Sequence, residues 1–307
     1  MQSILKVAIE NSKKITSNGK VATYIPELAK GNRDALGACI FDTSCNVISE
    51  GDYKTKFTIQ SVSKVIILIC ALVDNGKDVV FSKVGKEPSA DPFNSMAKLE
   101  MMETHKPSNP FINAGAIVCT SLVAGDNGIE KFSRILNVMK RLSNNDDIEV
   151  NYSVYNSEKL TGNTNRAIAY YLKGAGIIEK GVEDVLDAYF KCCSVEVVVE
   201  DIARIASVIA NNGVAPWSNE RLIPVDVNRI VMAIMMTCGL YDRSGEFCIE
   251  VGIPAKSGVG GCIMAVVPNR MGIAVVGPAL DKYGNSIGGS RVLEELSNKL
   301  NLSIFQE

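Results

Sequence analysis

The chain has 307 residues, and its 32 basic and 34 acidic side chains give a formal charge of −2. This near balance excludes a protein that binds nucleic acid through a strongly basic surface. Hydrophobic residues make up 47% of the chain and charged residues 21%, which is typical of a globular protein and not of a disordered or fibrous one. The longest apolar run, residues 65–73, is far shorter than the ~20 residues that a membrane helix needs, so no membrane segment is expected.

The N-terminal segment, residues 1–15, has the pattern of an amphipathic helix. Its apolar side chains include Ile4, Val7, Ala8 and Ile15, with polar residues between them. The segment lacks the unbroken apolar centre of a signal peptide. We therefore expect a cytoplasmic protein.

The cysteines and histidines do not form a metal-binding pattern. Five of the nine cysteines lie inside apolar runs, no CxxC pair occurs, and His105 is the only histidine. We expect reduced thiols that pack as small apolar side chains, and no metal site. With a single histidine, nucleophilic catalysis would need another kind of base. The five cysteines are Cys39, Cys70, Cys119, Cys238 and Cys262.

Two β-hairpins are predicted, one toward each end of the chain. Each consists of two short apolar stretches joined by a polar turn. The strands are predicted at residues 35–44, 46–52, 262–268 and 272–278. After them, apolar residues at helical spacing predict a final helix over residues 288–300, with Ser290 as its N-cap.

Between the hairpins the apolar residues follow long helical periods. These segments are residues 128–143, 165–176, 182–193, 195–213 and 225–239. Strands from both ends and helices from the middle predict an α+β fold: an antiparallel sheet flanked by the terminal helices, with an inserted helical subdomain. We expect one domain, with the sheet region at about 1–80 and 250–307 and the helical subdomain at about 81–249.

A Ser-x-x-Lys tetrad, Ser61 to Lys64, opens a strongly apolar helix that is expected to stop near Gly76. Residues three apart share one face of a helix, so the Lys64 amine can approach the Ser61 hydroxyl. Burial among apolar neighbours favours the uncharged amine, which can act as a base. An ordinary capped helix whose lysine extends to solvent is the alternative.

A second element, Lys256-Ser257-Gly258, comes just before the predicted strand at residues 262–268. β-Lactamases and penicillin-binding proteins pair their Ser-x-x-Lys with Lys-Thr-Gly or Lys-Ser-Gly on the strand beside the active site. Small residues there let a substrate lie against backbone N–H groups that stabilise an oxyanion. A glycine-rich turn into a hairpin is the alternative, but both motifs occur in the expected order.

Seven separated segments resemble those of the serine-dependent glutaminases. They are residues 24–32, 57–64, 109–117, 155–172, 189–197, 238–247 and 254–263. The resemblance is to the short bacterial members of the family. It implies the serine β-lactamase and penicillin-binding-protein-like fold and the hydrolysis of L-glutamine to L-glutamate and ammonia through a Ser-Lys acyl-enzyme.

The same resemblance implies the catalytic residues. Ser61 matches the nucleophile, Lys64 its base and Tyr241 a second proton-handling residue. The backbone amides of Ser61 and Val259 match the oxyanion hole. No metal or organic cofactor is needed for this route.

The substrate-binding residues also follow from the resemblance. Those that match the family's glutamine-binding set are Tyr24, Ser61, Asn113, Glu158, Asn165, Tyr189, Tyr241 and Val259. An amino acid needs an anion for its ammonium and neutral donors for its carboxylate, and Glu158 and Asn165 are suitable partners. Without the resemblance, the polar residues near Asn165 would be taken as a helix start.

Two other functions remain open at this point. One is another cytoplasmic serine amidase or esterase, or a β-lactam-interacting protein of the same fold. The other is an amino-acid-binding protein without turnover. The expected partners are the small molecule L-glutamine and further copies of the chain in a homo-oligomer, dimer or tetramer, with no nucleic acid and no membrane.

Overall fold

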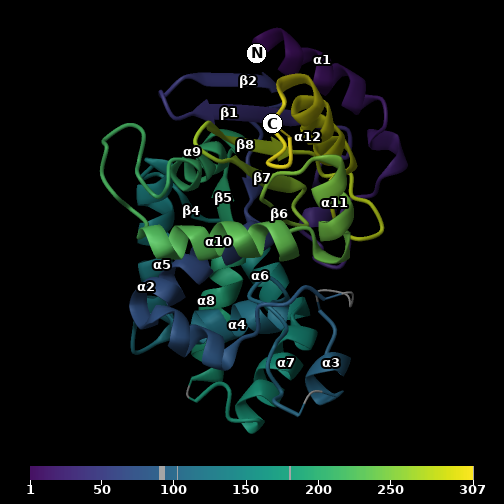
Figure 1. Ribbon diagram of the computed structural model, residues 1–307. Helices are drawn as coiled ribbons and strands as arrows, with labels where there is room; N and C mark the ends of the chain where they lie inside the picture. The colour runs from purple at the N-terminus through teal and green to yellow at the C-terminus, as the bar shows by residue number, and fades with distance from the viewer. Residues whose placement is uncertain (90–93, 102, 180, 307) are drawn as a thin grey trace.

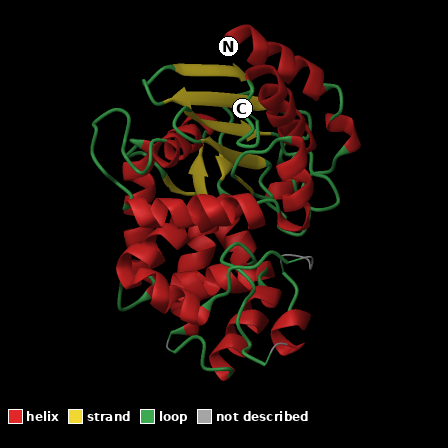
Figure 2. Cartoon of the chain, in the orientation of Figure 1, coloured by secondary structure: helices red, strands yellow, loops and turns green. Residues whose placement is uncertain are grey.

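The computed structural model describes residues 1–89, 94–101, 103–179 and 181–306. One half of the molecule contains a sheet with the two terminal helices beside it, and the other half is a group of helices (Figure 1). Most of the strands lie together in the first half (Figure 2). The α+β architecture predicted from the sequence is confirmed.

The larger sheet has five strands in the order β2-β1-β8-β7-β6, all antiparallel. Both predicted hairpins are present, and β1 pairs with β8, with Ile40 opposite Ile273. The two ends of the chain therefore meet in one sheet. The strands are β1 (Gly37–Asp42), β2 (Val47–Gly51), β6 (Ala255–Ser257), β7 (Cys262–Val267) and β8 (Met271–Val276).

The central strands are apolar throughout because both faces of the sheet are covered. Along β7, Ile263 and Ala265 enter the core beneath the terminal helices, whereas Cys262 and Met264 enter the core shared with the inserted helices. The same alternation holds along β1 and β8. An unbroken apolar run here indicates a strand buried on two sides.

The terminal helices, α1 (Gln2–Lys13) and α12 (Ile287–Leu300), cover one face of the five-stranded sheet (Figure 1). Helix α1 is present as predicted, but its buried apolar side chains are Leu5, Ala8 and Ile9, while Val7 is half exposed. The predicted cap of α12 is wrong: the N-cap is Ser286, whose hydroxyl accepts from the Gly289 N–H. Ser290 lies within the helix.

Helix α9 (Val199–Ala210) covers the opposite face of the sheet. It approaches β8 so closely that a Cβ at Gly272 would lie 2.2 Å from Ala203 O. The predicted helix over residues 195–213 was too long at its start. Residues 195–197 form β5 (Val195–Val197) of a second, three-stranded sheet with β3 (Phe57–Thr58) and β4 (Glu149–Val150).

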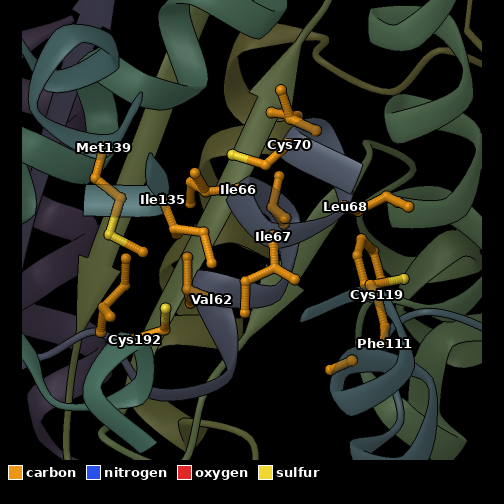
Figure 3. Close-up of a cluster of buried hydrophobic side chains, with 14 of the residues drawn as sticks. Val62, Ile66, Ile67, Leu68, Cys70, Phe111, Cys119, Ile135, Met139 and Cys192 are labelled. Carbon is orange, nitrogen blue, oxygen red and sulfur yellow. The ribbon is translucent and has the colours of Figure 1, made fainter. Parts of the chain in front are cut away.

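Helix α2 (Ser63–Lys83) runs through the core of the helical half. Ile66 and Ile67 are fully buried there among side chains of several other helices (Figure 3). The predicted stop appears as a break at Gly76, where φ is 77°, after which the helix resumes. The other α-helices are α3 (Ala97–Met101), α4 (Asn113–Leu122), α5 (Gly128–Ser143), α6 (Tyr152–Thr161), α7 (Asn163–Gly174), α8 (Val182–Cys193), α10 (Val225–Cys238) and α11 (Ser244–Glu250).

Among the residues described, no helix is long and apolar enough to cross a bilayer.

Candidate active site

A polar cavity of about 90 Å³ collects most of the predicted site residues. Seven of the nine line it: Tyr24, Ser61, Asn113, Glu158, Asn165, Tyr189 and Val259. They come from six separate segments of the chain, and the fold brings them together. The other two, Lys64 and Tyr241, are buried: Lys64 donates a hydrogen bond to Asn113 of the wall, and Tyr241 lies close to the Ser61 hydroxyl.

Ser61 lies in a tight turn between a strand and the central helix. The chain leaves β3 at Thr58, forms a 3₁₀ turn over Gln60–Val62 and enters α2 at Ser63. Gln60 has a φ of 46°, in the left-handed region that non-glycine residues seldom adopt. Ser61 is 7% exposed and reaches the cavity. Residues in this kind of conformation are frequent at functional sites.

The two backbone amides predicted as an oxyanion hole lie beside this turn. Gly258 packs against it, since a Cβ at Gly258 would lie 3.2 Å from Ser61 N. Within the described residues, neither the N–H of Ser61 nor that of Val259 donates a hydrogen bond to another group of the chain. Buried N–H groups are nearly always paired, so unpaired ones beside a polar cavity are available to a ligand.

Lys64 is 1% exposed and lies on the helix behind the cavity. Its Nζ donates to Phe111 O at 3.2 Å and to Asn113 Oδ1 at 2.7 Å. Burial lowers the pKa of Lys64 to about 8. Loss of solvation causes this shift, as the burial expected from the sequence implies, whereas the nearby Glu158 acts in the opposite direction.

Tyr241 approaches Ser61 from the other side. The Ser61 hydroxyl is close to the Tyr241 phenol, which donates to Ser257 O at 3.2 Å. Burial raises the pKa of Tyr241 to about 12. A neutral phenol is therefore held against the Ser61 hydroxyl, in a position to pass a proton.

Glu158 is 6% exposed, and its Oε2 is buried without a hydrogen-bond partner among the described residues. Burial raises the pKa of this carboxyl to about 8, and the nearby Lys64 acts in the opposite direction. A buried carboxyl oxygen without a partner is costly unless a ligand completes its hydrogen bonding. Glu158 lines the cavity, and its carboxyl group suits a cationic group of a ligand.

Asn113 connects the buried lysine with the cavity wall. Its Nδ2 donates to Asn165 Oδ1 at 2.9 Å, and its Oδ1 accepts from both Lys64 and the Tyr189 hydroxyl, the latter at 3.4 Å. Asn113 opens α4 and Asn165 lies in the first turn of α7. The network thus joins three helices and a tyrosine at one point.

Other residues of the wall were not singled out from the sequence. They are Ile25, Gln60, Asn94, Thr161, Gly162, Thr164 and Cys193. Thr161 and Thr164 belong to the polar stretch before α7 that also contains Asn165. Cys193 lies one helical turn after Tyr189 on α8, a spacing that places both on one face and could have predicted it. Tyr24 is 54% exposed and forms the rim.

The site has neither a metal cluster nor a histidine within the part of the chain that the structure describes. No group of three or more histidine, cysteine, aspartate or glutamate residues could hold an ion there. His105 is outside the cavity wall, where its Nδ1 interacts with the Tyr171 hydroxyl at 2.8 Å.

Comparisons with known proteins identify the family of the chain. Residues 19–305 match the family model described as glutaminase. A Clostridium tetani (strain Massachusetts / E88) protein named glutaminase is 57% identical, and one from Clostridium botulinum (strain Hall) is 54% identical. Each alignment covers 99% of this chain and the whole of the relative.

Solved structures of bacterial glutaminases are similar along their whole length. A Bacillus subtilis probable glutaminase complexed with 6-diazo-5-oxo-L-norleucine has a TM-score of 0.91 and 38% identity, with 99% of this chain and 97% of that chain covered. A B. subtilis glutaminase in a covalent complex with 5-oxo-L-norleucine has the same score and identity, with 99% of both chains covered.

The fold and the cavity define a hydrolase of the β-lactamase-like class, with a Ser-x-x-Lys helix at the edge of an antiparallel sheet. Within that class, the chain belongs to the glutaminase family.

Proposed function

We propose that this glutaminase hydrolyses the side-chain amide of L-glutamine to L-glutamate and ammonia through an ester on Ser61. The observation that carries the proposal is the environment of that serine. Its hydroxyl lies close to Tyr241, and two unpaired backbone N–H groups lie beside it. The covalent complex of the B. subtilis glutaminase with 5-oxo-L-norleucine supports a covalent route.

In the acylation step, Lys64 is the base. A neutral amine has two N–H groups and one lone pair, so it can donate to Phe111 O and Asn113 Oδ1 and still accept a proton. The proton of Ser61 moves to this lone pair as Oγ attacks the carboxamide carbon. The oxyanion that forms accepts from the N–H groups of Ser61 and Val259.

Collapse of the tetrahedral intermediate breaks the carbon–nitrogen bond. Tyr241 donates its proton to the departing nitrogen, which leaves as ammonia, and the proton on Lys64 restores the phenol. Water then attacks the ester by the same steps, with a proton passing to Lys64, and Ser61 is regenerated with release of L-glutamate.

Recognition of the amino-acid end is proposed for the opposite part of the cavity. The carboxylate of Glu158 accepts from the substrate ammonium, and Asn165 donates to the carboxylate of the substrate. Asn113 and Tyr189 orient these groups, and Tyr24 closes the rim.

Ammonia release from two matched serine variants tests this function. Ser61→Ala should reduce kcat by more than about 10³-fold while the protein remains folded, because the hydroxyl that forms the ester in this proposal is gone. Ser63→Ala is the control, since the Ser63 hydroxyl donates to Gln60 O and does not line the cavity. Comparable ammonia release by Ser61→Ala and the unmodified protein would contradict the proposal.

We also propose that the enzyme acts in the cytoplasm as a homo-oligomer. Nine cysteines, all unpaired and seven of them buried, suit a reducing compartment. Large apolar side chains such as Ile129, Leu160 and Ile249 are at least two-thirds exposed and could be covered by another copy. Light scattering of the purified protein tests the oligomer, and a dominant monomer mass would contradict it.

A further inference from the structure

The backbone of Tyr241 has a conformation that its own residue type does not favour. Its φ is 56°, in the left-handed region that a bulky residue seldom occupies. It begins the short turn Tyr241–Arg243, between the end of α10 and the start of α11. Such a conformation persists only where surrounding contacts hold it. The contacts that do so determine where the phenol lies relative to Ser61.

One buried side chain outside the cavity makes two of these contacts. Asn285 is fully buried and donates through Nδ2 to Leu240 O at 3.5 Å, the residue just before Tyr241. Its Oδ1 accepts from the Ser257 hydroxyl at 2.6 Å. Ser257 is also the residue whose carbonyl accepts the Tyr241 phenol. Asn285 therefore joins the backbone that carries Tyr241 to the backbone that receives its hydroxyl.

The loop that carries Asn285 is itself attached to the far side of the same turn. Asp281 Oδ1 accepts from the Asn285 N–H at 2.9 Å, and Asp281 N donates to Asn285 O at 2.8 Å. Asp281 Oδ2 pairs with Arg243 Nη1 at 3.0 Å. The loop is thus linked to the residue before Tyr241 and to the residue two places after it.

We propose that Asn285 is a positioning residue for the reaction. It keeps the Tyr241 phenol beside the Ser61 hydroxyl and does not touch the substrate. The inference rests on the proposed role of Tyr241. Asn285 does not line the cavity, so its removal leaves the binding groups in place. Its effect is expected in kcat and not in KM, and it should disappear when the phenol is absent.

A double-mutant cycle tests this dependence. Asn285→Ala should lower kcat by about tenfold or more, since a small misplacement of a reacting group is costly, while KM changes by less than about twofold. In a Tyr241→Phe background the same substitution should cause no further fall in kcat. The matched control is Asn228→Ala, which removes another fully buried asparagine, bonded to Ile209 O in a different part of the fold. It should leave kcat unchanged in both backgrounds.

The outcomes separate this inference from the function on which it rests. Full activity of Tyr241→Phe would contradict the proposed role of Tyr241 and the inference with it. A large loss in Tyr241→Phe with an unchanged kcat in Asn285→Ala would contradict the inference alone, as would equal losses in both backgrounds. If Asn285→Ala does not fold, Ser257→Ala can replace it, because it removes only the hydroxyl that donates to Asn285 Oδ1. The same changes in kcat and KM are then expected in both backgrounds.

Discussion

Lys64 Nζ lies 2.7 Å from the amide oxygen of Asn113, so the buried amine of the tetrad is bonded directly to the wall of the cavity. This acceptor carries no charge, so the amine has no ionised partner in direct contact there. Burial lowers the pKa of Lys64 to about 8 even though the nearby Glu158 acts in the opposite direction.

The activity should rise with pH through the pKa of Lys64. Below about 8 the amine is protonated and cannot accept the serine proton, and above it the lone pair is free. Asn113→Asp puts a carboxylate against the amine, which favours the charged form and should move the acid limb of kcat/KM to higher pH. Asn18→Asp adds the same charge at an exposed position and should leave the limb where it is.

Lys64→Arg complements the pH profile because it keeps a positive charge that cannot be removed in this pH range. It should be nearly inactive at every pH tested. A variant with most of its activity would exclude Lys64 as the base. Lys159→Arg, on the exposed side of α6, is the matched control.

Replacement of Glu158 by glutamine should weaken glutamine binding and stabilise the protein. At pH 8 and above, where the carboxyl is ionised, the KM should rise by about tenfold or more, since the substrate ammonium loses a charged partner. Burial raises the pKa of this carboxyl from 4.5 to about 8, so between these values the folded state binds more protons than the unfolded state. The stability of the unmodified protein therefore falls as pH rises through this window.

Urea unfolding at pH 5 and pH 8 measures the effect of Glu158→Gln on stability. Glu158→Gln should exceed the unmodified protein in free energy of unfolding by about 2 kcal/mol at pH 8, with a smaller difference at pH 5. Glu10→Gln, on the exposed face of α1, should show no such trend. An unchanged KM would mean that the ammonium is bound elsewhere.

Gly258→Ala should lower kcat strongly while the protein remains folded. The added Cβ would lie 3.1 Å from Ile59 O and 3.2 Å from Ser61 N, so the loop has to shift away from the serine. The Val259 N–H moves with it, and loss of one oxyanion donor costs roughly 10²-fold in kcat. Gly174→Ala is the control, because a Cβ there meets no atom within 4 Å. Equal kcat values for both variants would argue against an oxyanion hole at Val259.

Glutamine should be preferred over asparagine by about 10²-fold in kcat/KM. With the ammonium at Glu158 and the carboxylate at Asn165, the shorter side chain leaves its carbonyl short of Ser61. Ammonia release from the two amides under the same conditions measures the preference. Comparable values would show that these two residues do not set the distance to the nucleophile.

Much of the fold could be predicted because the pattern of apolar residues along the chain reflects which side chains are buried. The runs of β7 and β8 and the periods of α5, α8 and α10 appear where the sequence indicated. The strand at Val195–Val197 could not be separated from α9, because an apolar run of Val residues suits either structure and only pairing with Phe57–Thr58 decides it. Gly76 was recognised as a break, but continuation of α2 beyond it depends on packing.

The site residues could be predicted where they belong to a motif with a chemical role. Residues that are distant in the sequence and come together only in the folded chain were harder to predict. Ser61 and Lys64 are close in the chain, but the side chains beside them, Tyr241 and Asn113, are distant in sequence. Cys193 carries no motif and was missed. No local pattern places Asn285 against Leu240, because that contact depends on how the last loop packs.

The most direct test is the position of the covalent bond formed with 6-diazo-5-oxo-L-norleucine, the compound in the similar B. subtilis structure. The proposed mechanism predicts one 5-oxo-norleucine group per chain, with loss of dinitrogen, on the Ser61 hydroxyl, and its absence in Ser61→Ala. Cys262 is fully buried and outside the cavity wall, so Cys193 is the competing nucleophile, although burial raises the pKa of its thiol. Peptide mapping that finds the adduct on Cys193, and finds it again in Ser61→Ala together with continued ammonia release, would contradict the serine mechanism.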